Sequence, residues 1–400
     1  MIQILTGMIA NSNLGATRFH FVDGSSGSES AIARRQNLIT EAGTFRKGYI
    51  QLSTAPGVGK SWTFTLMKNG ATTAHVITIS GTDTFGSDTS NNIAVAANDR
   101  LAWRIVPAGT PASSIIRFTA EYEPTTAQRA VWGTSIQAGG GAGIPDGSTA
   151  YAIIGACDSP FDAAAANRSC VWAINATIKS FTFRGNVAPG AGKSWTLSIL
   201  KNGIEEASSI IVLSGATDVA VTVTGLNIGI VPGDLLAMKS IPSGTPNVSD
   251  PCWGISYEPS IDGQWNVSAF TDGATANFMP VNNAVQAAHD AVAANRTGLV
   301  LGADHAAYQI SGARMHLVTA PGVGQSRESN LLKNGSATGI AMTVADTATT
   351  ATDGSIVAFA PLDTWVWDEN QNGAPANSIM SLALLMGVEA AVSDAYAFIT

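Results

Sequence analysis

Hydrophobic and polar residues alternate with a period of two along much of the chain. Trp62, Phe64 and Leu66 alternate with threonines, which is typical of a strand with one buried face. An Asn-Gly turn follows at 68–70, because Asn-Gly accepts positive φ angles, and 76–79 is predicted to be the returning strand. Further strands are predicted at 92–96, 101–106 and 115–122, with turn residues about every ten positions. The pattern predicts an all-β protein built from antiparallel β-sandwiches.

This strand pattern occurs three times. Blocks of the form APGxGxSxxxxxxKNG at 55–70, 188–203 and 320–335 align without a gap, and their starts lie 188 − 55 = 133 and 320 − 188 = 132 residues apart. Repeats of this length are whole domains rather than solenoid units. We therefore predict three tandem sandwich domains, at 1–128, 129–264 and 265–400, of which the third is divergent.

An aspartate recurs before a later strand of each copy. Asp99, Asp234 and Asp363 each stand 12 residues before a proline of a glycine-containing turn. A calcium site would need several more oxygen ligands close by, and no acidic cluster surrounds these positions. We expect each aspartate to cap its own turn.

Several short motifs resemble chemistry that their context does not support. The stretch 57–61, GVGKS, lacks the first glycine of a phosphate-binding loop, because Thr54 stands there, and a strand rather than a helix follows. The five histidines share no repeat position, and the three cysteines form no CxxC pair. We predict no catalytic residue, no cofactor, no metal site and no enzymatic activity.

Composition narrows the possible partners. Only 12% of residues are charged and the net charge is −8, whereas an ordinary domain carries about a quarter charged residues. No Lys/Arg-rich run exists to bind nucleic acid, and no apolar run of about 18 residues could span a membrane. Residues 1–13 lack a basic region and a long apolar core, so no secretory signal is expected.

The charge is distributed unevenly over the three copies. Their basic and acidic residues give 10 − 8 = +2, 7 − 10 = −3 and 4 − 11 = −7. One fold with three unlike surfaces favours a different set of assembly contacts for each copy over a shared active site.

Four residues are candidates for contacts with other proteins or ligands. Trp62 and Trp195 recur at inward strand positions, which predicts a core role. Trp132, Trp172 and Trp265 have no clear counterparts, so we expect them to be exposed or at an interface. Arg327 replaces the recurring tryptophan in the third copy, where unpaired burial would be costly. It predicts either a shifted register or a strand that faces a partner or solvent.

The block APGxGKSWTxTxxKNG, followed by ITISGTDT at 77–84, resembles repeats of tailed-bacteriophage and metagenomic virion proteins. The resemblance extends over 46–124, less strongly over 180–259, and weakly over 313–388. It implies jelly rolls similar to tumour-necrosis-factor and complement-type heads. Because jelly rolls of this kind often act as trimers, three joined copies could form a single-chain pseudo-trimer; linear beads and a homo-oligomer stay open.

The resemblance implies a non-enzymatic virion protein. The first hypothesis is a decoration or cement protein on the capsid surface, with the major capsid protein or other virion proteins as partners. The alternative is a receptor-binding or glycan-binding module of a tail fibre or tail tip, with a host surface glycan as partner. That second function would require exposed aromatic side chains in a shallow groove.

Overall fold

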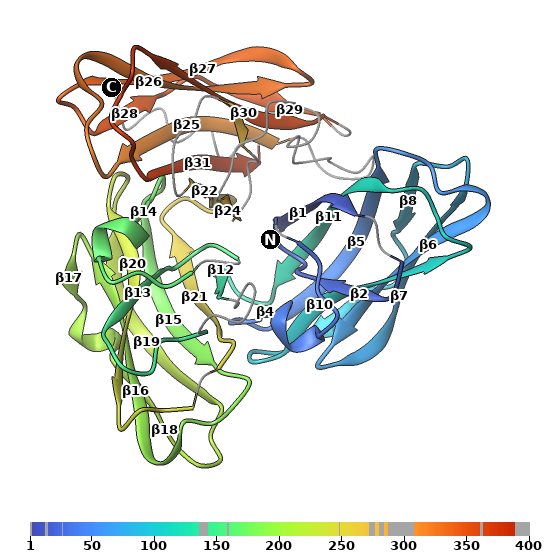
Figure 1. Ribbon diagram of the computed structural model, residues 1–400, viewed down its shortest axis with the longest axis horizontal. Coiled ribbons are helices and arrows are strands. Elements are labelled where there is room, and N and C mark those ends of the chain that lie inside the picture. Colours follow the sequence, from blue (N-terminus) through green and yellow to red (C-terminus); the bar gives the residue numbers. More distant parts are fainter. Residues whose placement is uncertain are drawn as a thin grey trace.

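The computed structural model describes residues 2–12, 15–25, 27–135, 143–157, 160–247, 249–271, 277–279, 284–286, 308–360 and 363–388. The fold is all-β, as predicted. Within these ranges, helical structure is confined to the short 3-10 turns Ile32–Arg34, Ala165–Arg168 and Ala207–Ser209. The strands form six sheets, which lie in three pairs that we call sandwiches 1, 2 and 3 (Figure 1).

Sandwich 1 contains the sheets β3-β1-β11-β5-β8, with β9 also on β5, and β2-β10-β6-β7, with β4 also on β10. The strands of its first sheet are β1 (Gln3–Ser12), β3 (Gly24–Ser25), β5 (Gly43–Leu52), β8 (Phe85–Asp88), β9 (Ile93–Val95) and β11 (Ser114–Pro124). Those of its second sheet are β2 (Arg18–His20), β4 (Asn37–Leu38), β6 (Gly57–Lys68), β7 (Ala71–Gly81) and β10 (Arg100–Ala108).

Sandwich 2 repeats this plan with the sheets β12-β21-β15-β19 and β13-β20-β16-β17, where β14 pairs with β20 and β18 with β16. The first sheet consists of β12 (Arg129–Thr134), β15 (Ala176–Arg184), β19 (Ala220–Ile230) and β21 (Cys252–Pro259). The second consists of β13 (Ala150–Ile153), β14 (Cys170–Val171), β16 (Gly190–Lys201), β17 (Ile204–Glu205), β18 (Ile211–Gly215) and β20 (Leu235–Ser243).

Sandwich 3 contains the sheets β24-β22-β31-β25-β28, with β29 on β25, and β23-β30-β26-β27. The first sheet consists of β22 (Gln264–Thr271), β24 (Ala284–Gln286), β25 (Tyr308–Leu317), β28 (Thr350–Asp353), β29 (Val357–Phe359) and β31 (Met380–Val388). The second consists of β23 (Asn277–Met279), β26 (Gly322–Lys333), β27 (Ser336–Asp346) and β30 (Trp365–Asn372).

The strand order is jelly-roll-like in each sandwich. The first and last long strands of a unit are antiparallel neighbours, as in the pairs β1/β11, β12/β21 and β22/β31. Between them the chain passes from one sheet to the other, so each sheet collects strands from distant parts of the sequence. The parallel pairs in the described part of the chain are the short β1/β3 and β22/β24 contacts.

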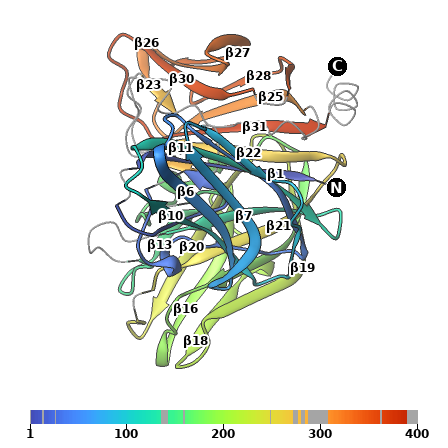
Figure 2. The same cartoon turned by 90° about the vertical axis from the view of Figure 1, so that its right-hand side faces the viewer.

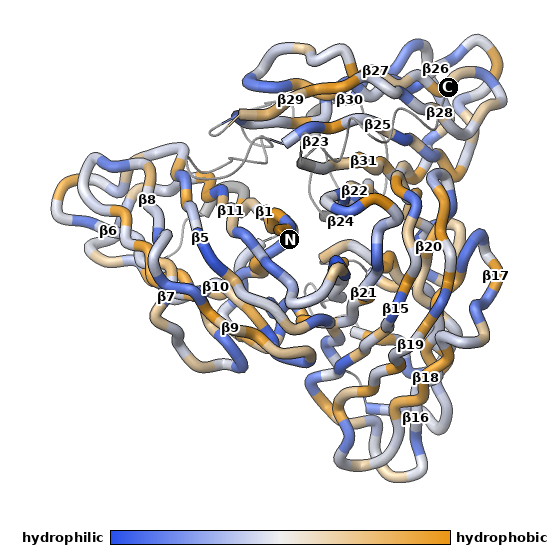
Figure 3. The backbone as a smooth tube through the Cα atoms, turned by 180° about the vertical axis from the view of Figure 1, so that it is seen from behind, coloured by the Kyte–Doolittle hydropathy of each residue, from blue (hydrophilic) through white to orange (hydrophobic). Residues whose placement is uncertain are grey.

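Each sandwich buries a core of its own between its two sheets. The alternation seen in the sequence places Trp62, Phe64 and Leu66 in the core of sandwich 1 and Trp195 and Leu197 in that of sandwich 2. Hydrophobic and hydrophilic residues alternate along the strands in the same way when the backbone is coloured by hydropathy (Figure 3). The hydrophobic effect of burying these side chains is the main force that holds each sheet pair together.

The three sandwiches stand around a common centre. The sheets with β1, β12 and β22 face inward, and the hairpins β6/β7 and β26/β27 lie on the outside (Figure 1). In the side view, β1 lies beside β22 and β31 (Figure 2), in agreement with the packing of Ile4 in the core cluster of sandwich 3. The arrangement is a closed ring of three units within one chain rather than linear beads.

Repeated backbone geometry explains the 16-residue block. Gly57 and Gly59 have φ angles of 101° and 72°, and their counterparts in the other two copies have nearly the same values. Asn69 and Gly70, with φ angles of 53° and 84°, form the predicted tight turn, which also recurs. Gly57 and Gly59 lie at the start of β6, where the register with β7 shifts between Gly57 and Ser61, and Asn69 and Gly70 connect β6 to β7. The block therefore has the structural role that its alternating pattern predicts.

Candidate functional site

Sandwiches 1 and 2 join through side chains that bind the backbone of the neighbouring unit. The Gln3 amide donates to the Ala130 carbonyl oxygen at 2.7 Å and accepts from the Ala130 N–H at 3.0 Å. On the adjacent strand, Tyr122 packs edge-on against Trp132, with ring centroids 5.7 Å apart. At the rim, Arg34 forms a 3.3 Å ion pair with Asp250.

Sandwiches 2 and 3 also join through side chains of one unit that bind backbone groups of the other. The Val171 N–H donates to Ser381 Oγ at 3.2 Å, and the Ala173 N–H donates to Asn266 Oδ1 at 2.9 Å. The Asn266 N–H in turn donates to the Tyr257 hydroxyl at 3.1 Å. Strand β14, at the edge of sandwich 2, thus lies on the inner sheet of sandwich 3.

The third junction closes the ring between sandwiches 3 and 1. Ile4 of β1 packs among buried residues of sandwich 3. The pKa of Tyr308 is raised far above its ordinary value, first by burial and then by the nearby carboxylate of Glu121 in sandwich 1. Glu121 is itself held by Arg46 at 2.9 Å and Lys47 at 3.3 Å.

The expectation of exposed tryptophans is wrong. All nine tryptophans are fully buried, including Trp132, Trp172 and Trp265. Trp132 does lie between two units, because it packs against Tyr122 of sandwich 1. Trp172 packs against Tyr257 of its own sandwich, and Trp265 against Tyr308 of its own. Burial of a large aromatic ring stabilises the fold more than exposure does. The absence of counterparts in the other repeats did not indicate this burial.

Arg327 is buried inside sandwich 3, so neither a shifted register nor an exposed strand accommodates it. It lies opposite Gln371, in the same register that places Trp62 opposite Pro107. Only 3% of Arg327 is exposed, and its guanidinium donates to the Ala376 carbonyl oxygen at 2.8 Å. Burial lowers the pKa of Arg327, and the nearby Glu369 carboxyl opposes this shift when it is ionised. A local polar pocket has thus replaced apolar packing.

Glu369 is the second unusual residue of this pocket. Its carboxyl accepts a 2.5 Å hydrogen bond from Ser329 Oγ, and the side chain is buried. Burial raises the pKa of Glu369 to about 8, against the smaller lowering effects of Ser329 and Arg327. The corresponding pair in sandwich 1 is Phe64 and Ile105, which is wholly apolar. Sandwich 2 pairs Leu197 with the buried Ser240 at these positions. Of the three corresponding pairs, a buried carboxyl group is therefore found in sandwich 3.

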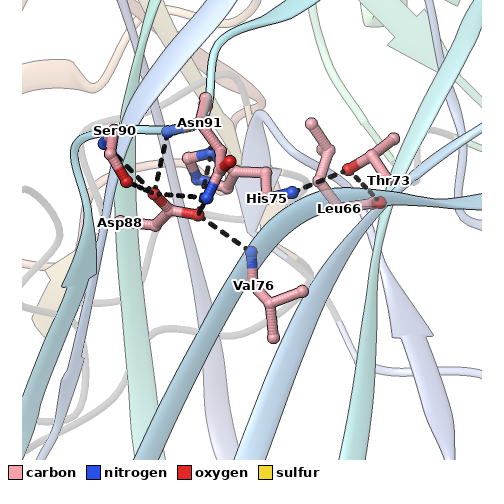
Figure 4. Close-up of polar contacts among 7 residues, drawn as sticks. All are labelled: Leu66, Thr73, His75, Val76, Asp88, Ser90 and Asn91. Atoms are coloured by element: carbon pink, nitrogen blue, oxygen red, sulfur yellow. Dashed lines mark hydrogen bonds and ion pairs between the residues drawn. The ribbon is translucent and has the colours of Figure 1, made fainter.

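The arrangement most similar to a catalytic pair lies in sandwich 1, where His75 faces Asp88 (Figure 4). His75 Nδ1 is 3.7 Å from Asp88 Oδ2 and 2.9 Å from the Asn91 carbonyl oxygen. Asp88 also accepts from the N–H groups of Val76, Ser90 and Asn91. The imidazole is completely buried, and a Cβ added at Gly48 would lie only 2.2 Å from its Nε2. Because the ring is completely buried, a substrate cannot reach it. The cluster holds the end of β8 and residues 89–91 against β7.

The repeated aspartates cap their own turns, as predicted. Each also accepts a hydrogen bond from the asparagine of the Asn-Gly turn in the same unit. Asp99 Oδ2 accepts from the Ala96 N–H at 2.8 Å, and Asp99 Oδ1 accepts from the Asn69 amide at 2.5 Å. Asn69 Oδ1 then accepts from the Arg100 N–H at 2.9 Å. The same contacts recur around the pairs Asn202/Asp234 and Asn334/Asp363. We call this arrangement the Asn–Asp latch.

A cavity of about 340 Å³ lies at the junction of sandwiches 2 and 3. Two basic side chains line it, Arg314 and His316, which both project from the outer face of β25. The sequence analysis did not select them. Their positions two residues apart on one strand face were the available signal. The remaining lining residues are Val171, Asn202, Gly233, Leu235, Met315, Thr349, Thr350, Ala351 and Thr352.

Two further observations concern metal sites and membrane spans. Among the residues described by the structure, no group of three or more His, Cys, Asp or Glu side chains is placed to hold a metal ion. In those same ranges, no helix has the length and apolar character needed to cross a membrane. A comparison with models of known protein families finds no match, and neither does a comparison with curated proteins.

Proposed function

We propose that this chain is a non-enzymatic virion protein of a tailed bacteriophage that decorates or cements the head. The observation that carries the proposal is the closed ring of three jelly-roll-like sandwiches within one chain. Such a ring presents a rigid, three-cornered body with a pseudo-threefold axis, and bodies of this symmetry suit positions where capsid subunits meet in threes.

The charge distribution supports an assembly role. The three units share a fold but carry net charges of +2, −3 and −7 by the repeat boundaries given above. Fusion into one chain allows each unit to evolve its own contacts, which identical subunits of a homotrimer cannot do. We expect the partners to be the major capsid protein or other virion proteins, and the location to be the capsid surface.

The interior of the molecule supports the same reading. Its polar clusters serve structure: the His75–Asp88 pair is buried, and each Asn–Asp latch closes a turn. The tail-fibre alternative with a glycan stacked on tryptophans is not supported, because all nine tryptophans are buried. Phe85 is an exposed aromatic side chain on β8.

Co-sedimentation with capsids tests the proposal. Purified full-length chain would be mixed with phage heads that lack it, and with heads that already carry it. We expect saturable binding to the first and little binding to the second, together with a higher temperature of head disruption after binding. Failure to bind depleted heads, or absence of the chain from washed particles, would overturn the proposal.

A further inference from the structure

The junction cavity between sandwiches 2 and 3 has features of a ligand site that the structural role does not use. Its volume of about 340 Å³ falls at the lower end of the roughly 300–1,000 Å³ range of small-molecule sites. The floor is the outer face of sandwich 3, with Arg314 and His316 opposite Thr352 and Thr350 on β28. The roof is the β19–β20 turn of sandwich 2, with Gly233 and the Asn202 turn.

Arg314 has no carboxylate partner in the described part of the chain. It forms no hydrogen bond or ion pair with any residue of those ranges, although its side chain is half-buried. The third copy contains only four basic residues and 11 acidic ones. A partly buried guanidinium without a carboxylate partner is costly unless an anion or water satisfies its donors.

The neighbouring junction shows that the cavity is a local feature rather than a property of the ring. At the junction of sandwiches 1 and 2, Asn98 occupies the position of Gly233, and its Oδ1 accepts from Thr222 Oγ1 at 3.5 Å. Gly233 removes that side chain in the second copy, and a Cβ added there would lie 3.6 Å from Arg314 Nη1. In sandwich 3, Arg314 pairs with Thr352 across β25 and β28; at the corresponding positions of sandwich 2, Thr182 pairs with Thr222. The space left by Gly233 and the guanidinium of Arg314 therefore both occur at the junction of sandwiches 2 and 3.

We propose that this cavity binds a small hydroxylated carboxylate, the chemistry of a sugar acid. The guanidinium of Arg314 offers a planar pair of donors that matches a carboxylate. The hydroxyls of Thr349, Thr350 and Thr352 line the cavity beside it and can bind ligand hydroxyl groups. Val171 and Leu235 provide an apolar wall for the C–H face of a sugar ring.

A single negative charge suits this site better than a doubly charged phosphate. Arg314 supplies one permanent positive charge. His316 is held mostly neutral, because burial lowers its pKa below the ordinary 6.5. A neutral imidazole can donate or accept one hydrogen bond, which suits a sugar hydroxyl. The proposal does not depend on the virion role, since it rests on the junction alone.

Ligand-observed NMR titration of the full-length chain tests the proposal with three probes: glucuronate, glucose and inorganic phosphate. We expect saturable binding of glucuronate, and binding of glucose and of phosphate that is at least about tenfold weaker, since glucose lacks the carboxylate and phosphate lacks the hydroxyls. Glucose binding as tight as that of glucuronate would show that Arg314 does not recognise a carboxylate, and would overturn the proposal. Tighter binding of phosphate would overturn the assignment to a carboxylate.

Variants locate the site. Arg314→Gln should weaken glucuronate binding by at least about tenfold, and Gly233→Asn, which installs the side chain of the neighbouring junction, should abolish it by filling the cavity. Arg104→Gln is the matched control, because Arg104 is also a half-buried, outward-facing arginine on a strand. Thermal unfolding of each variant checks its fold. Unchanged binding by Gly233→Asn would place the ligand elsewhere and refute the proposal.

Discussion

Ser329 Oγ donates a 2.5 Å hydrogen bond to Glu369 inside sandwich 3, at the strand positions where sandwich 1 pairs Phe64 with Ile105. The two sandwiches therefore solve the same packing problem with different chemistry. Sandwich 1 fills the space with hydrocarbon. Sandwich 3 fills it with a hydrogen-bonded carboxyl group and the buried guanidinium of Arg327, and this makes its stability depend on pH.

The melting temperature of sandwich 3 should fall as the pH rises from 5 to 9. The folded-state pKa of Glu369 is about 8 and lies above the ordinary value of 4.5, so the folded state keeps a proton that the unfolded chain loses. This contribution is complete below the ordinary pKa and is lost as the pH rises through the folded pKa, by roughly 1.4 kcal/mol at most for each pH unit. Differential scanning calorimetry at several pH values measures it.

Glu369→Gln keeps the shape and removes the titration, so its melting temperature should be nearly flat over the same range. Glu328→Gln, one strand position from Ser329, is the control and should retain the pH dependence of the parent. A Glu369→Gln variant that is still destabilised in parallel with the parent would show that another group controls the transition.

Replacement of the polar pocket by the residues of sandwich 1 should stabilise sandwich 3. The triple variant Arg327→Trp, Ser329→Phe and Glu369→Ile exchanges a buried polar network for apolar side chains in the same register. Such exchanges are often neutral or stabilising by about 1–4 kcal/mol. By contrast, Ser329→Phe alone would crowd the polar carboxyl group and should lower the melting temperature. A triple variant that is less stable than the parent would contradict the prediction.

The Asn–Asp latch should contribute to each unit through both conformation and hydrogen bonding. Asn69→Ala loses two hydrogen bonds and places alanine at a φ angle of 53°, so we expect a loss of about 2 kcal/mol. Asn69→Gly keeps the backbone freedom and loses only the bonds, so its cost should be smaller. Chemical unfolding of the two variants measures the difference. Equal effects would mean that the left-handed conformation contributes nothing.

Gln3 should control the opening of the ring between sandwiches 1 and 2. Gln3→Glu keeps an acceptor for the Ala130 N–H but cannot donate to the Ala130 carbonyl oxygen, and it introduces a buried charge. We expect faster hydrogen exchange of the β12 amides, with little change in the outer strands of sandwich 1. Gln51→Glu, a half-buried glutamine on β5, is the control. Unchanged protection of β12 in Gln3→Glu would show that this contact does not hold the junction.

The sequence contained most of the information on local structure. The alternation at Trp62, Phe64 and Leu66 predicted an inward strand, and the Asn-Gly turn and the capping role of Asp99 follow from local backbone chemistry. These features depend on residues close in sequence or on one strand, so a periodic pattern can reveal them.

Contacts between units could not be predicted in the same way. The sequence predicts Trp132 to be exposed or at an interface, and Arg327 to lie in a shifted register or on a strand that faces a partner or solvent. Both side chains are buried. Trp132 is covered by Tyr122 of another unit, and Arg327 is accommodated by Ala376 and Glu369 on distant strands. The Arg314 cavity is lined by Gly233 of the neighbouring sandwich, where an added Cβ would lie 3.6 Å from Arg314 Nη1. The Arg327 contacts depend on strands that meet within sandwich 3, and the other two depend on the closure of the ring. No local pattern encodes either.

An image reconstruction of whole phage particles tests the virion role most directly. If the chain decorates the head, the reconstruction should show a three-lobed density on the capsid surface, into which the closed ring fits with one orientation because its three units differ in net charge and so in their contacts. Labelling an outward residue of a single sandwich should then mark one lobe only. Particles that assemble with the chain entirely absent from the head would contradict the account.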